Sequence, residues 1–154
     1  MNAEFLVGVI SDTHGLLRPQ ALEALAGSQF IIHAGDIGNP DILPSLARLA
    51  RVEAVRGNVD SDAWAQALPE TTVVEVQGCL LYVLHDVKQL DLDPVAAGFA
   101  AVISGHSHSP LSEMRNGVLY FNPGSAGPKR FNLPISLGRL WLSSEGIRAE
   151  IVEL

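Results

Sequence analysis

Residues 5–15 read FLVGVISDTHG, an apolar run that ends abruptly in polar residues. Phe5 to Ile10 are rich in β-branched side chains, which is typical of a buried strand. Asp12 and His14 follow directly, so both are expected at the carboxyl end of that strand. Because ligands of open α/β sheets bind at this end of the strands, the segment predicts both an α/β fold and the place of its site.

The same order of an apolar run and a polar cluster recurs four more times along the chain. The runs are residues 30–32, 52–55, 80–84 and 100–103, and the clusters after them are AGD ending at Asp36, GNVD starting at Gly57, LHD containing His85 and GHSH from Gly105 to His108. Each cluster alone is weak evidence, because Gly-Asp and Gly-Asn are common turn dipeptides and a single histidine after an apolar run is usually a core residue. Four of the five histidines nevertheless lie in these clusters or in SDTHG, which favours one shared metal site.

Helical segments are predicted between the first three apolar runs. Residues 19–25 begin with proline, which favours the first helical position, and residues 40–49 repeat apolar residues at helical spacing. Residues 91–99 form a shorter candidate that glycine interrupts. Strands that alternate with helices predict right-handed βαβ units and a mostly parallel sheet.

Hairpin signals mark the rest of the chain, at Gln77-Gly78, Asn116-Gly117 and Glu145-Gly146. The β-like runs that flank them are residues 71–76, 118–121, 135–142 and 148–152. This pattern predicts antiparallel, meander-like β structure in the last third. Two mixed β-sheets packed face to face, with helices on their outer faces, bury both halves of such a chain, so we expect an αββα sandwich of the α/β class.

Composition favours a single globular domain over residues 1–154. The chain is 47% hydrophobic and 18% charged, and no linker, repeat or low-complexity tract divides it. A net charge of -7 with ten Lys and Arg residues argues against extended nucleic-acid binding, which needs clustered positive charge. Self-association stays open, because symmetric homo-oligomers are common.

Cysteine usage and the N-terminus bear on location and on the kind of metal site. The apolar run before Asp12 is too short for a signal peptide or a membrane span, and no basic region precedes it. Cys79 is the single cysteine, so no internal disulfide can form and a cysteine-rich zinc module is excluded. We therefore expect a cytoplasmic protein without a membrane partner.

The mixed imidazole, carboxylate and amide groups favour a hydrolytic metal centre.

The ordered series SDTHG, GD, GN, H and GHSH, followed by NPGS at Asn122 to Ser125, resembles the calcineurin-like metallophosphoesterase superfamily. Within it, the chain is similar to the small stand-alone phosphodiesterases, and the resemblance runs from Ser11 to Ser125. The resemblance implies a dinuclear metal centre. One ion would be held by Asp12, His14, Asp36 and His108, and the other by the bridging Asp36 with Asn58, His85 and His106. It also implies that Asp36, Asn58 and His85 are catalytic.

Spacing and charge support this interpretation. Residues two apart in an extended segment point the same way, so Asp12 should converge with His14, and His106 with His108. Two divalent ions, two ligand carboxylates and a bridging hydroxide would leave a charge of about +1, which favours an anionic phosphate ester. The resemblance implies hydrolysis of small phosphodiesters by a metal-bound hydroxide that attacks phosphorus. Manganese is the expected metal, with zinc, iron and nickel as alternatives.

One position departs from the pattern of the superfamily. Many members carry GNHE, whose histidine assists the substrate or the leaving group, whereas this chain has GNVD with Val59. Asp60 and Asp86 are candidates for a substitute proton donor or for support of a metal ligand. His33, the histidine outside the clusters, is expected to have a structural or orienting role.

Substrate contacts are predicted near the centre and around NPGS. Asn58 is one candidate, and the backbone N–H groups of Gly124 and Ser125 could line a phosphate pocket. Lys129 or Arg130 could reach a substrate oxygen.

A scaffold or interaction protein with weak or no catalysis is an alternative on the same fold. Some relatives of the superfamily serve in protein complexes, and Val59 in place of the motif histidine slightly favours such a scaffold role. Each ligand position is chemically competent here, which favours the enzyme. A metallo-β-lactamase-like hydrolase would need an HxHxDH run, which the sequence lacks.

Overall fold

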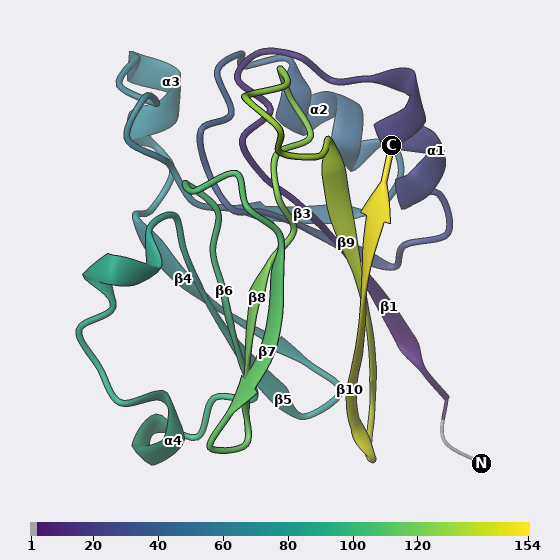
Figure 1. Cartoon of the computed structure of the whole chain (residues 1–154), viewed down its shortest axis with the longest axis vertical. Coiled ribbons are helices and arrows are strands. Elements are labelled where there is room, and N and C mark those ends of the chain that lie inside the picture. The colour runs from purple at the N-terminus through teal and green to yellow at the C-terminus, as the bar shows by residue number, and fades with distance from the viewer. Residues whose placement is uncertain (1–2) are drawn as a thin grey trace.

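The computed structural model describes residues 3–154, and its strands form two five-stranded sheets that pack face to face (Figure 1). The first sheet has the order β10-β9-β1-β2-β3, with β1 Phe5–Ile10, β2 Phe30–His33, β3 Arg51–Ala54, β9 Ser136–Ser143 and β10 Gly146–Glu153. The second sheet has the order β4-β5-β6-β8-β7, with β4 Thr71–Val76, β5 Cys79–Leu84, β6 Ala101–Ile103, β7 Leu111–Arg115 and β8 Val118–Asn122. The predicted architecture of two packed, mixed sheets is confirmed.

Each sheet combines a parallel centre with antiparallel hairpins. Strands β1, β2 and β3 are parallel to one another, as are β5, β6 and β8. The three predicted hairpins form as β4–β5, β7–β8 and β9–β10. The predicted meander is wrong, however, because β8 joins β6 in the second sheet and β9 joins β1 in the first. A hairpin signal specifies a turn but not the strand that the hairpin will join outside itself.

Helices α1 (Pro19–Leu25) and α2 (Ile42–Ala47) cover the outer face of the first sheet (Figure 1). Their buried side chains Leu25 and Leu46 belong to one apolar cluster with Ile31 of β2. Helix α2 is shorter than the predicted segment 40–49. Because proline has no N–H and is tolerated only in the first turn, Pro44 prevents a start as early as residue 40.

The outer face of the second sheet is covered by the segment between β5 and β6. It contains the short 3-10 helix η1 (Val87–Gln89) and helix α4 (Pro94–Ala97), which lies inside the predicted segment 91–99. The Asp93 carboxylate accepts hydrogen bonds from the first turn of α4, and Gly98 ends the helix with a φ of 81°. Helix α3 (Ala63–Gln66), between β3 and β4, was not predicted.

The main core lies between the two sheets. Strands of both sheets contribute fully buried side chains to it, among them Val9, Ile32, Val83, Ile103 and Phe121. Burial of such side chains stabilises the fold by about 1.5–3 kcal/mol each. The core fixes the parallel strands of one sheet against those of the other, so that their carboxyl ends face each other across one edge of the sandwich.

Candidate metal centre

The seven predicted metal ligands all lie in loops that follow the parallel strands. Those that follow β1, β2 and β3 are Asp12, His14, Asp36 and Asn58, and those that follow β5 and β6 are His85, His106 and His108. The structure brings them into two adjacent groups. Loops from both sheets thus build the site, which explains why its residues are spread over most of the chain.

The first group consists of Asp12, His14 and His108, whose potential ligand atoms all lie within 4.8 Å of one another. Nε2 of His14 lies 3.6 Å from Asp12 Oδ1, and Nε2 of His108 lies 3.3 Å from the same oxygen. The two imidazole Nε2 atoms are 3.2 Å apart. One carboxylate oxygen and two ring nitrogens therefore converge on a common point.

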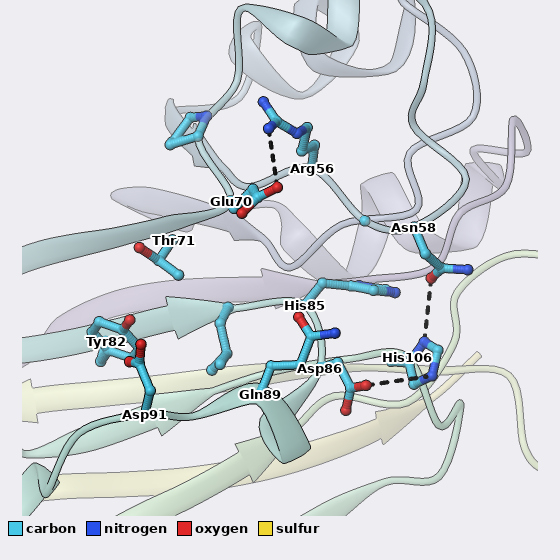
Figure 2. Close-up of a pocket in the computed structure, with 13 residues that line it drawn as sticks. Arg56, Asn58, Glu70, Thr71, Tyr82, His85, Asp86, Gln89, Asp91 and His106 are labelled. Carbon is cyan, nitrogen blue, oxygen red and sulfur yellow. Dashed lines mark hydrogen bonds and ion pairs between the residues drawn. The ribbon is translucent and has the colours of Figure 1, made fainter.

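The second group consists of Asp36, His85 and His106, again with ligand atoms within 4.8 Å of one another. Asn58 lies beside it, with its Oδ1 3.3 Å from His106 Nδ1 (Figure 2). Asp36 Oδ2 lies 3.1 Å from His85 Nε2 and 3.7 Å from His14 Nε2 of the first group. Asp36 therefore faces both groups, as a bridging carboxylate must.

Hydrogen bonds orient both carboxylates. Asp12 Oδ2 accepts from the Ser11 hydroxyl at 2.7 Å and from the His106 backbone N–H at 3.0 Å. Asp36 Oδ1 accepts from the Val59 backbone N–H at 3.0 Å. One oxygen of each carboxylate is thus fixed by the protein, and the other points toward the histidines.

The groups at the centre fit a cation. His85 Nδ1–H donates to the Ala34 carbonyl at 2.7 Å, which leaves the Nε2 lone pair directed at the Asp36 carboxylate. Over residues 3–154, both His85 Nε2 and Asp12 Oδ1 are buried without a hydrogen-bond partner. Unpartnered buried acceptors of this kind are costly unless a proton or a metal ion lies between them. The donor set of imidazole nitrogen and carboxylate oxygen suits a divalent transition metal.

The pKa values of these residues reflect the same arrangement. Burial favours the neutral forms of Asp12 and Asp36, but hydrogen bonds and nearby histidines outweigh it and lower both carboxyl pKa values. Burial also opposes charge on His85, yet Asp36 and the Ala34 carbonyl raise the pKa of that imidazole, so the Asp36 carboxylate favours a positive charge, a proton or a metal ion, at Nε2. The carboxylates are therefore ionised near neutral pH, as ligands must be.

Five of the seven residues have a positive backbone φ: Asp12 (55°), His14 (47°), Asp36 (56°), His106 (69°) and His108 (62°). For residues other than glycine, this conformation costs roughly 1–2 kcal/mol. The predicted convergence of Asp12 with His14 is confirmed, but the extended backbone that the prediction assumed is wrong, because the chain leaves the strand before these residues. The predicted convergence of His106 with His108 is wrong, because the two side chains point to different groups.

Asp60 is buried and fixes one loop of the site to another. Its carboxylate accepts from the backbone N–H groups of Ile37 at 3.0 Å, Gly38 at 3.1 Å and Gly57 at 2.9 Å. Because both of its oxygens are engaged in this way, Asp60 positions the loops that carry Asp36 and Asn58. The structure thus favours the supporting role over the proton donor.

Replacing Asp60 with alanine should lower the free energy of unfolding by about 2–4 kcal/mol, because one buried and two partly buried N–H groups lose a charged acceptor. Urea denaturation measures this change. Asp62→Ala is a matched control, since Asp62 is exposed and makes no capping hydrogen bond, and it should change stability by less than about 0.5 kcal/mol. Equal effects of the two substitutions would rule out the anchoring role.

His33 is fully buried and uses both ring nitrogens. The Thr13 hydroxyl donates to the Ile37 carbonyl at 2.8 Å, so it accepts from His33 Nε2–H at 3.0 Å. His33 Nδ1 accepts from the Gly35 N–H at 3.1 Å. These contacts fix a neutral imidazole, and burial lowers its pKa to about 4. The structural role predicted for His33 fits this geometry.

The neutral state of His33 makes stability depend on pH. The unfolded chain takes up a proton at this residue near pH 6.5 and the folded chain only near pH 4, so acid favours unfolding. Between pH 7.5 and 4.5, the fall in the free energy of unfolding should be smaller in His33→Gln than in the parent by about 2–3 kcal/mol. Guanidinium denaturation at the two pH values measures it, and an identical fall in both proteins would contradict the assignment.

Hydrogen bonds from the NPGS segment hold the loops that carry the metal ligands. The Ser125 hydroxyl donates to the Asp12 carbonyl at 3.0 Å, and the Gly124 N–H donates to Asn122 Oδ1 at 2.9 Å. Asn122 Nδ2 in turn donates to the Gly105 carbonyl at 2.9 Å. Gly124 and Ser125 therefore hold the loops of the ligands. The Gly124 N–H is engaged by Asn122, which argues against its predicted role as a phosphate donor, whereas the same role for the Ser125 N–H stays a prediction. Sequence reasoning missed Asn122, although its place in NPGS was a signal.

Arg130 and Val59 lie at the margin of the centre. Burial lowers the pKa of His108, Asp12 opposes this effect, and the positive charge of Arg130 adds to it. Arg130 is exposed. Val59 is also exposed, at 48%, so the position of the missing motif histidine faces solvent.

A cavity of about 990 Å³ opens beside the second group (Figure 2). Asn58, His85 and His106 form one part of its wall. A second cavity, of about 480 Å³, also has His106 in its wall. Asp86 lines both cavities, and its Oδ2 is 3.8 Å from His106 Nε2. In the described part of the chain, no helix has the length and apolar character needed to cross a membrane.

Comparisons with known proteins agree with the geometry. A probable metallophosphoesterase of Methanothermobacter thermautotrophicus is 35% identical to this chain over 159 residues, which cover 96% of this chain and 91% of the relative. Phosphodiesterase YfcE of Escherichia coli is 29% identical over 160 residues and 84% of each protein. The structure of Vacuolar Protein Sorting 29 from Cryptosporidium parvum has a TM-score of 0.78 at 19% identity and covers 98% of both chains, which shows a shared fold.

The family model of the calcineurin-like phosphoesterase superfamily domain matches residues 5–145, nearly the whole chain. This match spans all of the polar clusters, and it confirms the resemblance that the sequence motifs indicated. The chain belongs to the calcineurin-like phosphoesterase superfamily.

Proposed function

We propose that this protein is a metal-dependent phosphodiesterase that hydrolyses small phosphodiesters. The observation that carries the proposal is the pair of ligand groups that share Asp36, with unpartnered acceptors on Asp12 and His85 directed into them. Asp12, His14, Asp36 and His108 would hold one divalent ion, and Asp36, Asn58, His85 and His106 the other. The names of the relatives, a probable metallophosphoesterase and a phosphodiesterase, support the same activity.

The chain's own residues prepare the centre for an anionic substrate. When bound, two divalent ions would lower the pKa of water and offset the charge of a phosphate ester. Asn58 supplies a neutral oxygen, so it leaves more positive charge at the centre than aspartate would. Ser11 and the Val59 N–H hold the carboxylates of Asp12 and Asp36 in place. Arg130, whose charge acts on His108, is our candidate for contact with a phosphate oxygen.

The activity is tested by hydrolysis of bis(p-nitrophenyl) phosphate. We expect turnover with added Mn²⁺, less or none after treatment with EDTA, and recovery when Mn²⁺ is returned. Parallel assays with Zn²⁺, Fe²⁺ and Ni²⁺ rank the metals, of which we propose manganese as the preferred one. Protein that binds the metals but does not hydrolyse the phosphodiester would overturn the proposal.

A second candidate is a non-catalytic interaction protein on the same fold. The substitution of Val59 for the motif histidine and the shared fold with Vacuolar Protein Sorting 29 favour it. The assay above separates the two candidates, because a scaffold retains its fold without turnover.

Val59 has a consequence for substrate preference. With an apolar side chain where many relatives carry histidine, this position offers no general acid, which typically contributes about 10²–10⁴-fold. We therefore expect kcat/KM to fall steeply as the leaving group becomes more basic, from p-nitrophenyl to phenyl to methyl esters. Val59→His should flatten that dependence, whereas Val59→Leu, as the control, should keep it. Equal slopes for the parent and Val59→His would contradict this explanation.

A further inference from the structure

The cavity of about 990 Å³ extends well beyond the centre. Figure 2 shows His85 and His106 on one side, with Thr71, Tyr82 and Asp91 farther away across the cavity. It is large for a binding pocket, since such pockets usually measure about 300–1,000 Å³, and a phosphate group alone would fill little of it. His85 is 6% exposed, and it forms part of the cavity wall while its Nε2 faces Asp36 at 3.1 Å, so the cavity begins directly beside the metal ligands. A ligand bound at the metal centre could therefore extend into the cavity.

The charges of this wall are mostly negative. Among the described residues that line it, Arg56 is the single Lys or Arg, whereas Glu70, Asp86 and Asp91 are acidic, which gives a formal charge of −2. Arg56 is also engaged, because it donates to Glu70 Oε1 at 3.1 Å and to the Leu68 carbonyl at 2.7 Å. The carboxylates of Asp86 and Asp91 therefore determine the charge in the rest of the cavity. They would repel a second anionic group of a ligand bound there.

The remaining polar groups suit hydroxyls. Thr71, Tyr82 and Gln89 line the cavity and carry hydroxyl or amide groups that both donate and accept hydrogen bonds. Carboxylates such as Asp91 accept from sugar hydroxyls, as acidic residues do for ribose in dinucleotide-binding folds. Tyr82 is mostly buried against Phe99, with ring centroids 5.1 Å apart, so its position is fixed.

We propose that this cavity binds an uncharged arm of the substrate that carries hydroxyls, a sugar or a nucleoside, and disfavours an arm with a second phosphate. The proposal rests on the phosphodiesterase function proposed above, and it adds the chemical class of the group beside the phosphate. The phosphate lies at the metal ligands, and the arm extends past His106 toward Asp91.

Calorimetry with the Mn²⁺-loaded protein tests the proposal without requiring turnover. The probes are inorganic phosphate, ribose 5-phosphate, uridine 5′-monophosphate and uridine 3′,5′-bisphosphate. We expect the two sugar monophosphates to bind about tenfold more tightly than inorganic phosphate, and the bisphosphate about tenfold more weakly than uridine 5′-monophosphate. Equal binding of the two sugar monophosphates would show that the sugar alone accounts for the added affinity. Tighter binding of uridine 5′-monophosphate would show that the base also enters the cavity. Both results support the proposal.

Two results would overturn it. Sugar monophosphates that bind no better than inorganic phosphate would show that the cavity takes no arm, and a bisphosphate that binds as tightly as the monophosphate would show that its charge is irrelevant. Both leave the proposed function intact, whereas failure of inorganic phosphate itself to bind would remove both proposals.

A pair of variants isolates the charge of the wall. Asp91→Asn should narrow the tenfold ratio between uridine 5′-monophosphate and the bisphosphate to about threefold, because it removes one unit of repulsion. Asp41→Asn makes the same chemical change on the surface before α2, outside the cavity, and should leave the ratio unchanged. Equal ratios in both variants would reject the role of Asp91.

Discussion

Replacing Asp36 with asparagine should lower metal-dependent kcat/KM for bis(p-nitrophenyl) phosphate by about 10³-fold or more. Asp36 Oδ2 faces His85 Nε2 at 3.1 Å and His14 Nε2 at 3.7 Å, so one carboxylate serves both ligand groups. An asparagine amide keeps the shape of the side chain, and its Oδ1 can still accept from the Val59 N–H. It lacks the charge to hold two cations together, so the loss should come from the metals and not from the fold.

Metal analysis by inductively coupled plasma spectrometry and circular dichroism accompany this assay. Asp36→Asn should contain less than two Mn²⁺ per chain and should remain folded. Asp41→Asn makes the same substitution on the surface and should retain full metal content and activity. Retention of both ions and of turnover in Asp36→Asn would refute the bridging role.

Gly57→Ala should weaken metal binding by about 10–100-fold, the range typical for loss of the groups that orient metal ligands. A Cβ atom at Gly57 would collide with both Oδ1 and the backbone nitrogen of Asp36. The φ of Gly57 is not in the left-handed region, so the effect is one of space alone. Because Gly57 N–H also donates to Asp60, the displaced loop would move Asn58 together with Asp36.

Gly27→Ala is the control for this prediction. Gly27 has a φ of 87°, and beyond its chain neighbours no atom lies within 4 Å of the place that a Cβ would take. Alanine there costs only the backbone strain of about 1–2 kcal/mol. Titration with Mn²⁺ should therefore show normal affinity in Gly27→Ala and a loss in Gly57→Ala. Normal affinity in both proteins would show that the close approach of Gly57 to Asp36 is dispensable.

The strands and the meeting of the polar clusters could be predicted from the sequence because both obey short-range rules, whereas the assignment of ligands to two metals came from the resemblance to the superfamily. FLVGVI and the other apolar runs form strands, and the polar clusters after them meet because parallel strands end at one edge. The partner of each hairpin was not readable, since β9 joins β1 through contacts between residues far apart in the chain. Local turn signals contain no information on such pairings.

The sequence pattern also did not predict the backbone conformation of the metal ligands or the residues that hold their loops in place. The left-handed backbone of Asp12 and Asp36 depends on hydrogen bonds between loops, such as that from the His14 N–H to the Asp36 carbonyl at 2.9 Å. In the sequence, Asp60 has no feature that distinguishes it from an ordinary loop aspartate. Its role comes from the three backbone N–H groups of two loops that it binds in the folded protein. The role of such residues is defined by partners that only the tertiary structure supplies.

Anomalous diffraction at the manganese edge, from crystals of the full chain grown with excess Mn²⁺, tests the central claim most directly. We predict two peaks about 3.5–4 Å apart, one within bonding distance of Asp12, His14 and His108 and the other of Asn58, His85 and His106, with Asp36 bound to both. A single peak, or peaks that do not contact Asp36, would contradict the dinuclear centre.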